Sequence, residues 1–285
     1  MDLVALALVI VAAFIHATWN LLAKRAGGGQ LFVWLYSAAI AVLYFPLVAW
    51  VMFQGNAQWS ALIIAAIVVS GFLHLAYAIC LQTGYRKADL SVVYPIARGT
   101  GPALSVAGAI LLLGEPFTGA VAGGAALIVG GVMVIGLAGN RAHGALWPGI
   151  RWGAYTGAII ACYTVADGYT VRYLAVSPIL LDYFSNLVRL VALTPSVVTH
   201  RKLVVTEWRT NARLIVAVGA LAPLSYILVL YAMTRAPVSV IAPARELSMM
   251  VGVLFGWWLL KEADVARRLA GAALIACGVT LLMFY

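Results

Sequence analysis

Long apolar stretches, separated by short polar breaks, run along the whole chain. Each is about 20 residues long, the length that an α-helix needs to cross a bilayer. The longest polar break, 200–213, is interpreted as a loop. The pattern predicts an all-α integral membrane protein with ten transmembrane helices. The predicted spans are 3–23, 31–53, 59–82, 89–113, 117–138, 152–172, 178–199, 212–233, 237–260 and 266–285.

The second half of the chain repeats polar positions of the first. Arg98 lies 17 residues before Glu115, and Arg245 lies 17 residues before Glu262. The flanking segments are also similar: KADLSVVYPIARGTGPALSVAGAILLLGEP matches RAPVSVIAPARELSMMVGVLFGWWLLKEA at an offset of 147 to 148 residues. Duplication inside an apolar chain is typical of transporters built from structural repeats, whose substrate site lies at the repeat interface.

The repeat predicts two five-helix units. We expect the first at 1–138, a linker at 139–151 and the second at 152–285. Because each unit has an odd number of spans, the second copy must enter the membrane upside down, which makes an inverted repeat. Two equivalent halves that exchange conformations would expose a central site to either side of the membrane in turn, by alternating access.

Composition supports a membrane protein. The chain is 65% hydrophobic and 9% charged, with a mean hydropathy of +1.03, whereas soluble domains carry about 25% charged residues. The net charge of +9 lies in short loops rather than in one patch, so we expect no nucleic-acid partner. The three cysteines, Cys80, Cys162 and Cys277, lie in apolar segments and are expected to be buried, without a disulfide or a metal.

The distribution of Lys and Arg predicts the orientation. The odd-numbered loops hold 13 of the 18 basic residues, and the even-numbered loops and termini hold only Arg172 and Arg235. Basic residues gather in cytoplasmic loops. The bias therefore predicts cytoplasmic odd loops and places both termini outside.

Six Arg, Asp or Glu residues lie well inside predicted spans, away from the span ends: Arg98, Arg189, Arg245, Asp167, Asp182 and Glu246. A charged group at the bilayer centre costs about 2.5–3.5 kcal/mol or more unless it faces a partner or a cavity. We therefore expect a polar cavity between spans one, three, four, six, seven and nine.

Structural roles are alternatives for these charges. A structural ion pair is about as good an explanation of Arg98 or Arg245 as substrate contact. Arg189 and Asp182 share a helix face and are expected to pair. Glu246 is adjacent to Arg245, and neighbours on a helix point about 100° apart, so it needs another partner or a proton.

Two further acids, Glu115 and Glu262, are expected at helix starts. Glu115 precedes Pro116, a residue typical of a first helical turn, where a negative charge complements the helix dipole. Motifs of enzymes are missing: the sequence contains no Walker loop, G-x-S-x-G, H-E-x-x-H or Cys/His cluster. We therefore expect no enzyme, no metal and no cofactor.

Four segments carry a family resemblance: HATWNLLAKRA (16–26), DLSVVYPIARGTGP (89–102), YTVADGYTVR (163–172) and TRAPVSVIAPARE (234–246). With the repeat and the G-E or K-E pairs, they resemble the drug/metabolite transporter superfamily of EamA-domain type, over essentially the whole chain. The branch they resemble includes members named for association with phosphonate utilisation. The resemblance implies a multi-pass secondary transporter of small metabolites in the bacterial inner membrane, often an exporter.

The resemblance also implies a central cavity formed by spans three, four, eight and nine. Together with the polar positions of span one, the candidate substrate-binding residues are His74, Tyr77, Tyr94, Arg98, Ser225, Tyr226, Arg245, Trp19 and Asn20. The candidates for proton coupling are Glu246, Asp167 and Asp182, with Glu246 favoured.

These observations predict a proton- or gradient-coupled carrier of a small polar or zwitterionic metabolite, such as an amino acid or an aminophosphonate-like compound. The arginines would hold a carboxylate or phosphonate, and an acid would hold the amine or carry the proton. The expected partners are the metabolite and the lipid bilayer, with the chain a monomer or homodimer. The alternatives are a flippase for an amphiphilic or lipid-linked substrate and a sensor or assembly subunit without transport.

Overall fold

The fold is known from a computed structural model, which describes all residues except 28, 56–57, 138–145 and 253–264. Within these residues all regular secondary structure is helical, so the chain is all-α as predicted. The helices are α1 (Leu3–Arg25), α2 (Gln30–Leu43), α3 (Phe45–Phe53), α4 (Ala61–Lys87), α5 (Leu90–Leu113), α6 (Gly119–Leu137), α7 (Leu146–Arg172), α8 (Pro178–Val198), α9 (Arg201–Arg235), α10 (Val238–Ala244) and α12 (Val265–Met283).

Several helices are built to cross a membrane. In the described part of the chain, α1, α4, α5, α6 and α9 are long and apolar enough, and α2 with α3 forms a sixth span if their 43° bend lies within one crossing. Large apolar side chains such as Leu111 and Phe53 are exposed, as lipid contact requires. The chain is therefore a multi-pass membrane protein. The helices α7 and α8 correspond to two more predicted spans, but polar residues leave them without an apolar stretch as long and as hydrophobic as those of the other five.

Three details of the sequence interpretation were wrong. The polar stretch 200–213 is not a loop, because α9 begins at Arg201; its residues include good helix formers and neither Gly nor Pro. The helix α7 begins at Leu146, inside the expected linker. Cys80 is buried as expected, but Cys162 and Cys277 are exposed on the outer surface of the bundle, where a small apolar side chain can equally face lipid.

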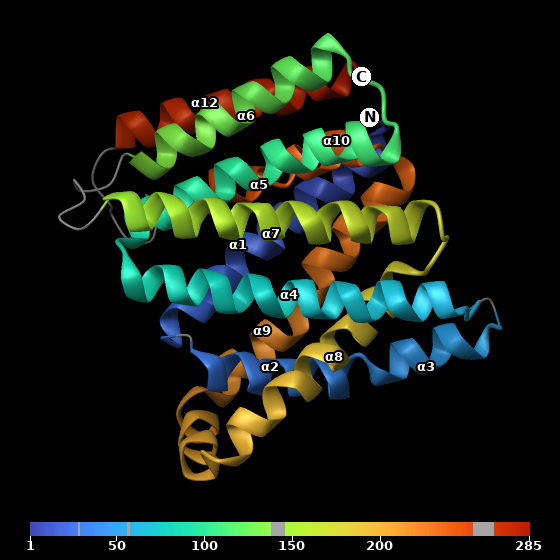
Figure 1. The fold of residues 1–285 in the computed structure, drawn as a ribbon, viewed down its shortest axis with the longest axis vertical. Coiled ribbons are helices and arrows are strands. Elements are labelled where there is room, and N and C mark those ends of the chain that lie inside the picture. The colour runs from blue at the N-terminus through green and yellow to red at the C-terminus, as the bar shows by residue number, and fades with distance from the viewer. Residues whose placement is uncertain (28, 56–57, 138–145, 253–264) are drawn as a thin grey trace.

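The helices form a bundle with two distinct ends (Figure 1). The helices α6 and α12 lie side by side at one end, and α2, α3 and α8 lie at the other. The backbones of α6 and α12 come very close: a Cβ added at Gly131 would lie 2.5 Å from the Gly271 oxygen, and one at Gly271 would lie 2.6 Å from the Gly131 oxygen. Small residues permit this close packing between membrane helices.

Glu115 joins the two halves of the chain. It is buried, and its two carboxylate oxygens accept hydrogen bonds from the backbone N–H groups of Val238 (2.7 Å) and Ser239 (2.8 Å). The predicted role at the start of its own helix was therefore wrong: α6 begins only at Gly119, and Glu115 caps the first turn of α10 instead. The matching Glu262 lies outside the described residues.

The chain ends lie together. The Met1 ammonium donates to the Met283 carbonyl at 3.4 Å, and Arg235 pairs with Asp2 at 3.0 Å. The Ala5 N–H and Arg235 lower the pKa of the Asp2 carboxyl, so its stabilising contribution is present above its ordinary pKa and is lost as the pH falls through the lowered value.

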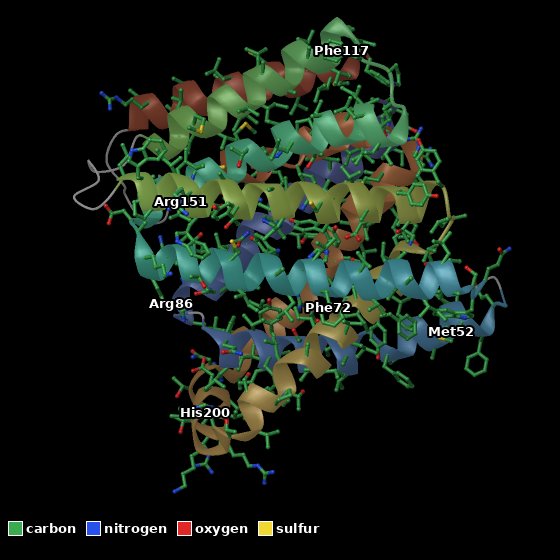
Figure 2. The ribbon with its side chains drawn as sticks, viewed as in Figure 1. Met52, Phe72, Arg86, Phe117, Arg151 and His200 are labelled. Carbon is green, nitrogen blue, oxygen red and sulfur yellow. The ribbon has the colours of Figure 1, made fainter. Side chains whose placement is uncertain are left out.

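Basic residues lie on the side of the bundle away from the chain ends. Figure 2 shows Arg86, Arg151 and His200 there, and Met52 on the opposite side.

Candidate functional site

Arg98 and Arg245, the pair that the repeat singles out, lie on the wall of one cavity of about 20 Å³. We call it the arginine cavity. The helices α1, α5 and α9 and the chain after α10 form it, so both halves contribute. Its lining residues are Val9, Ala12, Ala13, His16, Arg98, Ser225, Tyr226, Val229, Arg245 and Ser248.

Arg98 forms an ion pair across the two halves. Its Nη2 lies 2.9 Å from Glu246 Oε2 and donates to Ser248 Oγ at 3.2 Å. Only 11% of the Arg98 side chain and 4% of the Glu246 side chain are exposed, so the pair is almost fully desolvated. The partner that Glu246 needs is therefore an arginine of the other half.

Arg245 is held more loosely than Arg98. It lies in a turn after α10, and residues 247–252 continue as helix. Its Nη1 donates to Thr164 Oγ1 at 3.3 Å, and its guanidinium lies 5.3 Å from the centre of the Tyr226 ring, in a cation–π arrangement. The described residues include no ion-pair partner for Arg245. Within the described part of the chain, the Arg245 guanidinium is thus not paired with an acid.

Asp167 is the centre of a second polar cavity, of about 30 Å³. Its Oδ2 accepts a hydrogen bond from Tyr226 (2.6 Å) and lies 3.0 Å from His74 Nε2. We call it the carboxylate cavity; α4, α7, α8 and α9 form it. Its lining residues are Ser70, His74, Asp167, Leu181, Asp182, Ser185, Asn186, Arg189 and Tyr226. Tyr226 thus lines both cavities.

The predicted pairing of Arg189 with Asp182 is not what the structure shows. Arg189 Nη2 donates to Asn186 Oδ1 at 2.7 Å, and its guanidinium lies over the Tyr36 ring. The ion pairs among the described residues do not include Asp182. A separation of seven residues spans two helical turns, whereas Asn186 is only one turn from Arg189.

The other predicted residues have more ordinary contacts. Trp19 donates to Ser225 Oγ at 3.2 Å, which links α1 to α9 beside the arginine cavity. Asn20 donates to the carbonyl of His16 in its own helix. Tyr77 makes an edge contact with the Tyr163 ring, with 5.8 Å between ring centres. Tyr94 is partly buried against the apolar core. Within the described part of the chain, neither polar cavity is lined by Trp19, Asn20, Tyr77 or Tyr94.

Sequence reasoning missed two small polar residues of the site. Ser248 contacts Arg98, and Ser70 lines the carboxylate cavity. Helical spacing could have found both: Ser248 follows Arg245 by three residues, and Ser70 precedes His74 by four. Thr164, which contacts Arg245, lies on the polar part of the sixth predicted span beside Asp167.

A larger apolar groove of about 460 Å³ lies between α4 and α8. Trp59, Phe72 and Phe184 are among its lining residues, and none of the residues that line the polar cavities lines it. The helices α4 and α8 pack closely between the groove and the carboxylate cavity: a Cβ added at Gly71 would lie only 2.6 Å from the Val188 Cβ.

The chain is similar to known proteins in its fold and in the sequence of its second half. Its fold is similar to that of a protein of known crystal structure, with a TM-score of 0.75 over 98% of each chain at 18% sequence identity, a likeness that shows the fold alone. No curated protein matches the sequence. The sequence model of the EamA-like transporter family matches residues 147–284, almost the whole second half. This match over the second half supports a place for the chain in the drug/metabolite transporter superfamily.

Proposed function

We propose that this protein is a secondary transporter that moves a small polar metabolite with an anionic group across the bacterial inner membrane by alternating access. The observation that carries the proposal is the arginine cavity. Arg98 and Arg245 come from matching positions of the two halves, meet in one buried space and are balanced there by one acid, Glu246. A carboxylate or phosphonate supplies the missing negative charge. The likeness to the phosphonate-associated branch stays a prediction.

Alternating access needs two equivalent halves, and the helix contacts support ten spans in an inverted repeat of this kind. Exchange of the halves turns α1, α2, α4 and α6 into α7, α8, α9 and α12. The contact of α1 with α9 then becomes that of α7 with α4, and the contact of α2 with α9 becomes that of α8 with α4. The contacts of α2 with α8 and of α6 with α12 map onto themselves.

Contacts between single residues also map onto one another when the two halves are exchanged. Gly124 approaches the oxygen of Gly278, and Gly271 approaches the oxygen of Gly131. Gly124 and Gly271 are 147 residues apart, as are Gly131 and Gly278. The offset of the sequence repeat therefore turns one contact into the other, which supports the proposed units 1–138 and 152–285.

Both polar cavities are about the size of one or two water molecules, so a metabolite enters only after the halves move apart. An anionic substrate would compete with Glu246 for Arg98. Glu246 would then be a buried carboxylate without its partner and would take up a proton. The ion pair thus couples substrate to proton, and Glu246 remains the favoured proton carrier ahead of Asp167 and Asp182.

The test begins with a thermal-shift screen of the purified protein against small carboxylates, phosphonates and amino acids, followed by uptake into liposomes. We expect accumulation driven by a pH gradient for the compounds that stabilise the protein. Glu246→Gln should remove this dependence and retain exchange of substrate. Unchanged pH dependence in Glu246→Gln would exclude Glu246 as the proton carrier. A wild type without pH dependence would be a facilitator, and a wild type that neither binds nor moves any compound overturns the transporter.

The orientation can be measured with single cysteines. With Cys80, Cys162 and Cys277 replaced by alanine, Val205→Cys is expected to be labelled only after membranes are opened, because basic residues stay on the cytoplasmic side. Val205 is exposed, as labelling requires. The control is Met52→Cys, which is exposed on the opposite side (Figure 2) and should be labelled in intact cells. The reverse labelling pattern would place the basic side outside and the two termini in the cytoplasm.

The alternatives have less support. A flippase needs a lateral opening that leads from lipid to a polar site, but the apolar groove between α4 and α8 shares no lining residue with either polar cavity of the described chain. A sensor or assembly subunit without transport gives no reason for two arginines that line one buried cavity.

A further inference from the structure

We infer that the carboxylate cavity binds a compact monovalent cation, either the ammonium group of a zwitterionic substrate or Na⁺. The inference rests on the proposed function for its link to the substrate, but the cavity itself is argued from its own atoms.

The first argument is charge. The charged residues in the lining are Asp167, Asp182 and Arg189, and His74 is the other titratable group besides Tyr226. Two carboxyl groups thus face a single guanidinium, and His74 Nε2 lies 3.0 Å from Asp167 Oδ2. A bound cation would balance an ionised carboxylate that the guanidinium does not, as burial of ionised groups in a low-dielectric region requires.

The second argument is that the cavity lining contains buried hydrogen-bond acceptors without a partner in the described chain. Asp167 Oδ1 and Ser70 Oγ are buried and have no hydrogen-bond partner among the described residues, and both residues line this cavity, whose lining also includes one unpaired buried donor, Arg189 Nε. Asp167 is completely buried and Ser70 is 1% exposed. Unpaired buried acceptors are costly, so they indicate a missing donor or ion. Oxygen atoms of carboxylate, hydroxyl and amide groups suit both an ammonium group and Na⁺.

The third argument is size and position. A volume of about 30 Å³ fits one ammonium group or one small ion, not a whole metabolite. Tyr226 connects this cavity to the arginine cavity, because its hydroxyl donates to Asp167 and its ring lies under Arg245. One cavity lacks a positive charge and its neighbour lacks a negative charge. A zwitterion satisfies both.

Matched pairs of probes test the inference on the purified full-length protein. We compare β-alanine with propionate and 2-aminoethylphosphonate with ethylphosphonate by thermal shift and calorimetry, each in NaCl and in choline chloride. If the cavity takes the substrate's ammonium group, the amino compounds bind at least tenfold more tightly than their partners in either salt. If it takes Na⁺, NaCl stabilises the protein without any organic probe. Asp167→Asn should abolish either effect, and Ser70→Ala should weaken it.

The outcomes separate the two proposals. Binding of propionate or ethylphosphonate depends on the arginine cavity alone, so its absence for all probes counts against the proposed function, while a Na⁺ effect could still support the cation site. If these anions bind, but the amino group does not raise the affinity and NaCl does not raise the melting temperature, the proposed cation site is wrong. Retention of either effect in Asp167→Asn also overturns it. Asp182→Asn provides the same test should Asp167→Asn fail to fold.

Discussion

Replacing Arg98 by alanine is expected to abolish transport and to destabilise the fold by about 3–5 kcal/mol, the usual cost of breaking a buried ion pair. The cost arises because Glu246 stays buried without the guanidinium that lies 2.9 Å from it. Arg245→Ala is expected to abolish transport at a much smaller cost in stability, because Arg245 has only a long hydrogen bond to Thr164 and the ring of Tyr226. Thermal unfolding in detergent and liposome uptake measure the two effects.

Two controls separate binding from folding. The double variant Arg98→Met with Glu246→Gln removes both charges, so it should recover stability and remain inactive. Arg209→Ala removes an exposed arginine in α9 and should change neither property. Normal uptake by both single variants would make Arg98 and Arg245 merely structural residues. Equal stability losses in Arg98→Ala and Arg245→Ala would contradict the difference in their contacts.

Glu115→Ala is expected to destabilise the protein by about 3 kcal/mol or more, because hydrogen bonds to a charged group contribute about 1.5–3 kcal/mol each and two are lost. The loss leaves the N–H groups of Val238 and Ser239 buried without their acceptor. Glu115→Gln keeps one side-chain acceptor, so it should give an intermediate melting temperature.

The matched control is Glu207→Ala. Glu207 is a partly exposed acid whose side chain accepts from Asn211 within the same helix, so its loss should change stability by about 0.5 kcal/mol or less. A Glu115→Ala protein that melts like the Glu207→Ala protein would show that the link from Glu115 to α10 adds nothing to stability.

Much of the fold was predictable because a bilayer leaves few choices. Backbone groups in lipid must be satisfied within a helix, so apolar runs of the right length become helices. The limits of α1, α4 and α5 lie close to those predicted. The errors occur where that rule does not apply: residues 200–213 are polar and are helical by propensity, and the bend between α2 and α3 at Tyr44 has no signal in the apolar pattern except Pro46.

The site was predictable in its residue types and not in its pairings. The repeat singled out Arg98 and Arg245, which the structure brings to one cavity. The partners of Glu246 and Glu115 come from the other half of the chain, and no helical spacing reports such contacts. For the same reason the separation of opposite charges into two cavities was not visible: it depends on how Asp167 and Tyr226 meet across α7 and α9.

The close packing of α6 against α12 has a mechanical consequence. In the proposed cycle this pair maps onto itself, and its glycines bring the two helix backbones very close together. It would therefore act as a fulcrum, and a rocking motion about it would grow with distance along the bundle. Figure 1 places α2, α3 and α8 at the far end of that lever. A small rotation at the glycines would thus become a large displacement at α8, which carries Asp182 and Arg189, so the carboxylate cavity would open wider than the arginine cavity for the same turn.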